Sequence, residues 1–143
     1  MDKIIVAVDG SEHAMRALEK AKELGLAFGS KIVIVNVVDS FHYHVNIDDS
    51  IVSERLLYLE TSKKSAEALL VKAKERLDEL GDQVETVLLD GDPPHMLINY
   101  IESSDADLVV IGSHGVKGLR QFMLGSVVSK LIHHVDKSVM IVR

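Results

Sequence analysis

Short apolar runs alternate with longer amphipathic stretches along the whole chain. The runs are rich in valine and isoleucine and carry little charge, which is the pattern of strands buried on both faces of a parallel sheet. Five such runs predict five strands, at residues 4–8, 31–38, 84–89, 108–111 and 139–142.

The first two stretches between these runs predict amphipathic helices. The first helix begins after Ser11, a suitable N-cap, and ends near Gly29. Its inner face is predicted to hold Ala14, Leu18, Ala21 and Phe28. A polar, irregular segment over 39–50 precedes a long helix that runs to about Leu80 and stops at Gly81. The apolar stripe of that helix comprises Ala66, Leu69, Leu70, Ala73, Leu77 and Leu80.

Two further helices complete the pattern. Asp92 is a cap and Pro93 occupies the first turn of one helix, whose inner face holds Leu97, Ile98 and Ile101. The last helix covers 127–134. Regular alternation of strands and helices predicts an α/β fold, an open five-stranded parallel sheet with helices on both faces. We expect one domain over residues 1–143, Rossmann-like, with the flavodoxin-like strand order 3-2-1-4-5.

In such sheets, ligands bind beyond the carboxyl ends of the strands, where the strand order reverses. Asp9 and Gly10 follow the first strand, Val37 and Val38 end the second, and Gly112 ends the fourth. If the first and fourth strands are neighbours, these residues meet in one crevice.

Composition narrows the classes of function. The 143 residues carry a net charge of −6 and no basic block, which argues against nucleic acids and anionic membranes as partners. The absence of cysteine excludes disulfides, thiolate metal sites and a cysteine nucleophile. No signal peptide or membrane-spanning run is evident, so we expect a cytoplasmic protein.

A glycine-rich stretch between the fourth strand and the last helix carries the clearest chemistry. Two residues separate Gly112 from Gly115, nine separate Gly115 from Gly125, and Ser126 follows directly. A glycine-rich loop that leads into a helix N-terminus offers free amides and a favourable dipole to an anion such as a phosphate. The spacing matches neither a P-loop nor the dinucleotide-binding glycine motif.

This spacing resembles the ATP-binding signature of the universal stress protein family, which is glycine, two residues, glycine, nine residues, glycine, then serine or threonine. The resemblance extends to the opening strand and turn, from Ile4 to Ser11, and to Asn36 and Val37 at the end of the second strand. It implies an ATP-binding member of that family.

By this resemblance, Asp9 lies near the nucleotide and its Mg or Mn ion, the Val37 backbone meets the adenine edge, and Ser126 meets the phosphates. The implied nucleotide site comprises Ala7, Val8, Asp9, Val37, Ile111, Gly112, His114, Gly115, Gly125, Ser126 and Val127. Two residues depart from the family pattern. Ser138 replaces a proline before the last strand, and His114 replaces an arginine, which weakens a charged phosphate contact.

Plainer interpretations stay open for several residues. The three glycines can be turn residues, and Asp9 can simply start the first helix through an Asx turn. His42 and His44 form no complete metal site, and we interpret them as loop residues. His133 and His134 suit the C-terminal end of a helix. Lys117 and Arg120 either screen phosphates or face solvent.

The spacing of Leu119, Phe122 and Met123 predicts a short packed helical turn.

Val139 to Val142 would form an apolar edge strand, and such edges pair with other chains. We therefore expect a homodimer through this strand, as the family resemblance also implies.

Three functions follow from these observations. The first is an ATP-binding, nucleotide-dependent regulatory module of the stress response, with ATP or another adenine nucleotide as ligand and a protein partner that the sequence does not identify. The second is slow ATP hydrolysis or phosphoryl or adenylyl transfer. No positioned base, arginine finger or second acidic metal ligand is evident for it, so efficient catalysis is not expected. The third is a nucleotide-free dimeric scaffold, against which the intact glycine signature argues.

Overall fold

The computed structural model describes residues 1–40, 52–116 and 123–143. Several expectations lie outside these described residues, namely those for His42, His44, Lys117, Leu119, Arg120 and Phe122.

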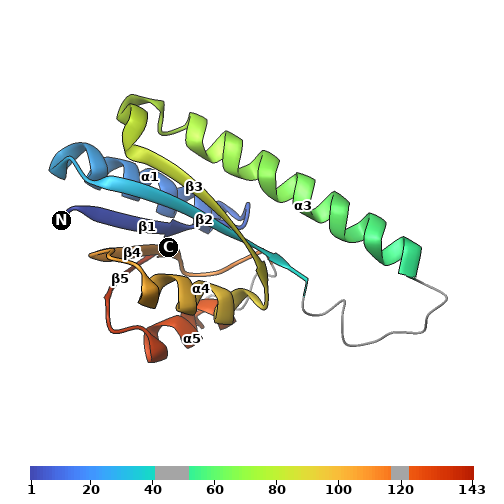
Figure 1. Ribbon diagram of the computed structural model, residues 1–143. Coiled ribbons are helices and arrows are strands. Elements are labelled where there is room, and N and C mark those ends of the chain that lie inside the picture. The colour runs from blue at the N-terminus through green and yellow to red at the C-terminus, as the bar shows by residue number, and fades with distance from the viewer. Residues whose placement is uncertain (41–51, 117–122) are drawn as a thin grey trace.

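Five strands form one parallel sheet in the order β3-β2-β1-β4-β5, which confirms the predicted topology (Figure 1). The strands are β1 (Lys3–Ala7), β2 (Lys31–Asp39), β3 (Val84–Gly91), β4 (Leu108–Gly112) and β5 (Ser138–Val142). The central strand β1 is fully buried at Ile4, Ile5 and Val6, because it pairs on both sides and is covered on both faces. This burial explains its unbroken apolar run.

Helices α1 (Glu12–Phe28) and α3 (Val52–Glu75) cover one face of the sheet, and α4 (Pro93–Ser103) and α5 (Ser126–His134) cover the other (Figure 1). The hydroxyl of Ser11 caps α1 by accepting the amide of Ala14 at 3.2 Å. Asp92 caps α4 with Pro93 in its first turn, as predicted. The two apolar layers, one on each face, supply the core of the fold.

The second helix ends earlier than predicted. α3 stops at Glu75, and a separate 3-10 helix, η2 (Asp78–Gln83), carries Leu80 and Gly81. The amides of Leu77 and Leu80 each bond a carbonyl three residues back, at 2.9 Å, so the chain tightens after the α-helix. Leu77 and Leu80 are nevertheless buried, as the stripe predicts.

Two predicted inward positions are wrong. Phe28 is 61% exposed, because α1 makes its close approach to the sheet at Gly25, where a Cβ would lie 2.8 Å from Cδ1 of Ile32. Phe28 is the last residue of α1 and lies past this contact. Met123 is 62% exposed, so the described end of the expected packed turn does not pack.

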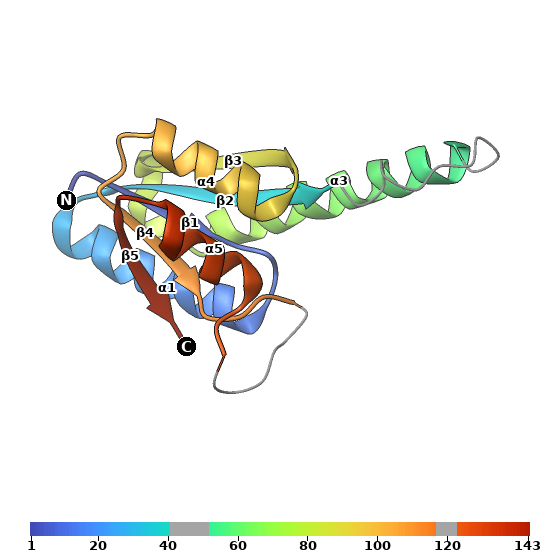
Figure 2. The same cartoon turned by 90° about the horizontal axis from the view of Figure 1, so that it is seen from below.

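The amino-terminal half of α3 extends beyond the carboxyl ends of the strands (Figure 2). It exposes Leu56, Leu57 and Tyr58 there, whereas Ala66, Leu70 and Ala73 of the same helix are buried against the sheet. Among the helices that the structure describes, none is long and apolar enough to cross a lipid bilayer.

Candidate functional site

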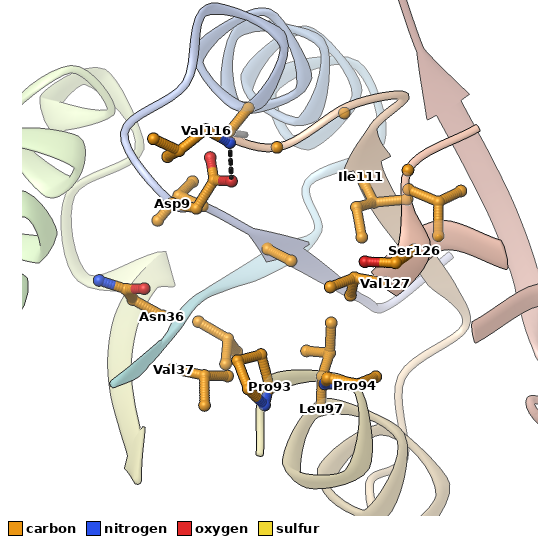
Figure 3. Close-up of a pocket in the computed structure, with 18 of the residues that line it drawn as sticks. Asp9, Asn36, Val37, Pro93, Pro94, Leu97, Ile111, Val116, Ser126 and Val127 are labelled. Carbon is orange, nitrogen blue, oxygen red and sulfur yellow. Dashed lines mark hydrogen bonds between the residues drawn. The ribbon is translucent and has the colours of Figure 1, made fainter. Parts of the chain in front are cut away.

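A pocket of about 530 Å³ opens at the carboxyl ends of β1, β2 and β4, beside the first turns of α4 and α5 (Figure 3). Residues more than a hundred positions apart meet there because β1 lies between β2 and β4. The structure brings every residue of the expected nucleotide site into its lining: Ala7, Val8, Asp9, Val37, Ile111, Gly112, His114, Gly115, Gly125, Ser126 and Val127.

One end of the pocket is apolar. Figure 3 shows Pro93, Pro94 and Leu97 of α4 beside Val37 of β2. These α4 residues were not predicted as part of the site, although the Asp92-Pro93 helix start was visible in the sequence. These residues reach the pocket because α4 packs against β2 and β3, and a local sequence pattern does not predict that contact.

The sequence also did not predict three of the charged residues that line the pocket. Besides Asp9, the pocket is lined by Asp39 at the end of β2 and Asp92 at the start of α4. The parallel pairing of β2 with β3 sets Asp39 opposite Gly91, next to Asp92. Lys130, one turn into α5, also lines the pocket and is the only lysine or arginine in the lining that the structure describes.

Residues 112–116, called the glycine segment below, lie between the starts of α1 and α5. A Cβ on Gly112 would lie 2.6 Å from the carbonyl carbon of His13 in α1. On the other side, the amide of Gly125 donates to the carbonyl of Ser113 at 2.9 Å. The segment is therefore built into the contact between two helix N-termini.

Helix α5 begins without a side-chain cap. Gly125 is its N-cap, and no side chain of the described residues accepts from the first turn, whereas Ser11 and Asp92 cap α1 and α4. Within the described part of the chain, the amides of residues 126–128 have no acceptor, and the first helical bond is Ser129 to Gly125 at 2.9 Å. The hydroxyl of Ser126 points into the pocket (Figure 3). Together these groups form a donor-rich wall.

The His114 side chain is held by the protein through one of its two ring nitrogens. Its Nδ1 lies 2.9 Å from the hydroxyl of Ser113, which also lies 3.2 Å from Nδ1 of His13. The two imidazole rings are 5.0 Å apart and tilted. Nε2 of His114 is buried and has no partner among the described residues. The His114 side chain thus packs between the glycine segment and α1.

Both oxygens of the Asp9 carboxylate accept backbone amides. Oδ1 accepts from Ser11 at 2.9 Å, and Oδ2 accepts from Val116 of the glycine segment at 3.1 Å (Figure 3). The described residues contain no cluster of three or more histidines and acids that could hold a metal ion. Any ion at Asp9 would therefore complete its coordination with ligand oxygens and water.

The whole chain, residues 1–143, matches the family model described as the universal stress protein family. The chain belongs to this family. Among curated relatives, the universal stress protein YxiE of Bacillus subtilis (strain 168) is 32% identical over 149 residues, which cover 99% of each chain. The alignment with YxiE therefore spans nearly the full length of both chains.

Solved structures agree on the fold. The universal stress protein UspA from Lactobacillus plantarum superposes with a TM-score of 0.88 at 20% identity, covering 99% of this chain and 97% of its own. A universal stress protein in complex with cAMP gives 0.68 at 23% identity over 99% and 96%. The Archaeoglobus fulgidus universal stress protein in complex with dAMP gives 0.67 at 24% identity over 100% and 98%.

Proposed function

We propose that this universal stress protein binds an adenine nucleotide, with ATP as the expected ligand, in the pocket between α4 and α5. The observation that carries the proposal is the uncapped start of α5, whose amides open onto a pocket of about 530 Å³. Unsatisfied amides at a helix N-terminus bind phosphate, and the volume suits a small-molecule ligand. The related structures that hold cAMP and dAMP support the adenine nucleotide class.

The two ends of the pocket suit the two ends of a nucleotide. The apolar wall of Val37, Pro93 and Leu97 matches a planar base, while Asp39 and Asp92 offer acceptors to an amino group or to ribose hydroxyls. The amides of 126–128, which have no acceptor among the described residues, and the Ser126 hydroxyl match the phosphates. In this orientation the base lies over β2 and the phosphates over the glycine segment.

A divalent ion, Mg or Mn, is expected with the triphosphate. Mg²⁺ is commonly held by one or two carboxylates together with phosphate oxygens, and Asp9 supplies one such carboxylate at the pocket. Bound there, the ion would screen the phosphates from the carboxylates of the lining.

The biological role that we propose is regulatory. Phosphates bound at the amides of 126–128 would contact the glycine segment and so change the surface around it, which a partner protein would detect. Such a switch requires that nucleotide binds two states of the protein with different affinity. A homodimer through β5 and a cytoplasmic location belong to the same proposal.

The proposal is tested on purified protein with the variant Ser126→Pro. Proline is favoured at the first helical position, where its missing amide is not part of the helix bonding, and Gly125 already has the extended ψ of 159° that a residue before proline prefers. The variant should keep its melting temperature but lose one amide donor and the hydroxyl. We expect ATP affinity to fall by about tenfold to a hundredfold, the effect of losing charge-assisted hydrogen bonds.

Heat denaturation followed by chromatography identifies nucleotide carried through purification, and calorimetry measures the affinity of added ATP. Ser126→Ala, which keeps the amide, is the matched control and should lose less affinity than Ser126→Pro. Release of ADP where ATP was supplied would favour slow hydrolysis. If wild-type protein releases no nucleotide and its melting temperature does not rise with ATP, the scaffold function replaces this proposal.

A further inference from the structure

The Asp9 carboxylate connects the turn after β1 to the glycine segment, although the two lie more than a hundred residues apart in sequence. Its Oδ1 is fixed by the amide of Ser11 at 2.9 Å, which orients Oδ2 toward the amide of Val116 at 3.1 Å. The carboxylate points toward Val116 in Figure 3. Because carboxylates form the stronger class of hydrogen bond to backbone amides, this contact favours one placement of the segment.

Gly115 stands directly against the same oxygen. A Cβ built on Gly115 would lie 2.7 Å from Oδ2 of Asp9, closer than any ordinary contact. Gly115 is not among the described glycines with positive φ, so its backbone conformation is open to other residues. Within the described structure, the carboxylate of Asp9 is thus the group that a side chain at 115 would displace.

A second link holds the segment from the same side. The hydroxyl of Ser11 donates to the carbonyl of His114 at 3.4 Å while it also accepts the amide of Ala14. The turn that leads into α1 therefore positions two consecutive peptide units of the glycine segment. Both Gly115 and Val116 line the pocket opposite the start of α5.

From these contacts we infer that Asp9 is a positioning residue for the glycine segment and that residue 115 is glycine chiefly to leave room for the Asp9 carboxylate. The carboxylate acts on the pocket through Val116, by holding the wall that faces the phosphates. This assigns to the second signature glycine an intramolecular role, in addition to any close approach of ligand. Its effect on affinity rests on the proposed nucleotide function, whereas its effect on the fold does not.

A double-mutant cycle tests the inference by thermal unfolding without ligand. Gly115→Ala should displace the carboxylate from Val116 and lower the melting temperature by about 2–4 °C, the effect of one net hydrogen bond in a chain of this size. Asp9→Ala should lower it by at least as much, because the Ser11 contact is lost too. In the Asp9→Ala background, Gly115→Ala should add almost nothing.

Asp92→Ala supplies the matched control. Like Asp9, Asp92 is an aspartate of the pocket lining whose carboxylate accepts a backbone amide, but it caps α4 and does not contact residue 115. In that background Gly115→Ala should retain its full effect. Equal effects of Gly115→Ala in the wild-type and Asp9→Ala backgrounds would overturn the inference. So would an unchanged melting temperature for Gly115→Ala alone.

The four proteins of the cycle, namely wild type, Gly115→Ala, Asp9→Ala and the double variant, are then titrated with ATP. We expect both single variants to bind more weakly and the double variant to match Asp9→Ala. Losses that multiply would mean that Gly115 serves the ligand independently of Asp9, which contradicts the inference. If no protein in the set binds a nucleotide, the proposed function fails, while the unfolding cycle still decides the role of Asp9.

Discussion

Gly112 packs directly on the backbone of His13. A Cβ at Gly112 would lie 2.6 Å from the His13 carbonyl carbon and 2.8 Å from the amide nitrogen of Ala14. Unlike the carboxylate near Gly115, these backbone atoms cannot rotate away. The first signature glycine therefore allows the start of α1 to rest on the end of β4, and the fold requires it whether or not a nucleotide binds.

Substitution at Gly112 should accordingly destabilise the protein itself. We expect Gly112→Ala to lower the free energy of unfolding by about 1–3 kcal/mol, as overpacking of a close contact does. Gly125→Ala is the comparison, because its Cβ would lie 3.4 Å from the nearest atom, an ordinary contact. It should cost less than about 1 kcal/mol, the difference between glycine and alanine as N-caps. Urea unfolding of both variants checks the contrast, and equal losses would contradict it.

Lys130 should discriminate between nucleotides by their number of phosphates. Helical side chains lean toward the helix N-terminus, so the Lys130 stem lies over Ser126 and Val127. Its positive charge is opposite in sign to the three carboxylates of the lining, which are Asp9, Asp39 and Asp92. We expect Lys130→Gln to weaken ATP binding by about threefold to fivefold, AMP binding by less, and both losses to shrink at high salt.

Calorimetric titration with ATP and AMP at two salt concentrations measures this effect. Lys72→Gln is the matched control, since Lys72 is an exposed helical lysine on α3 and its side chain has no ion pair or hydrogen bond within the described residues. An equal loss for both nucleotides with Lys130→Gln would show that Lys130 does not contact the phosphates.

Asp107 should make stability depend on pH in acid. The amides of Lys3 and Asp2 donate to its Oδ2 at 3.0 and 2.6 Å, and these bonds hold the pKa of the Asp107 carboxyl below its ordinary value. A lowered pKa in the folded state gives stability that is present above the unfolded pKa of about 3.9 and is lost as pH falls through the folded value. The urea concentration at which half of the protein is unfolded should therefore decrease as the pH is lowered below about 5.

Asp107→Asn should flatten that drop while lowering stability at neutral pH. Urea unfolding at several pH values between about 3 and 7 measures the change. Asp82→Asn in η2 is the control, because Asp82 is exposed and makes no side-chain hydrogen bond or ion pair within the described residues. A wild-type pH profile retained by Asp107→Asn would rule out this role.

The sequence predicted those features that depend on local pattern or on strand order. The strands of the sheet are continuous apolar runs, and their order places Asp9, Val37 and Gly112 at one crevice. The fuller list of site residues came from the family resemblance. Ser126 opens α5 as its position after Gly125 suggests.

Features that depend on contacts between distant elements were missed. Lys130 and Pro93 join the pocket only because α4 packs beside α5, and Asp39 joins through the register of β2 with β3. The clash that a Cβ at residue 115 would make with the Asp9 carboxylate is equally invisible in sequence. Phe28 has the correct helical phase but lies at the last residue of α1, a boundary that periodicity does not locate.

The open edge at β5 should pair with a second copy of the chain. The carbonyl of Val142 accepts the amide of Ser113 at 2.7 Å, so the backbone groups of Val142 point toward β4. Successive residues of a strand point their amide and carbonyl groups to opposite sides, so those of Ile141 point away from β4. Ile141→Pro removes an outward amide while sparing the bonds to β4, as proline does on edge strands. We expect sedimentation to show a dimer for wild type and a monomer for this variant. Ile141→Ala shortens the same side chain but keeps the amide, so it should remain dimeric. A monomeric wild type would contradict the predicted dimer, and a dimeric Ile141→Pro would place the association at another surface.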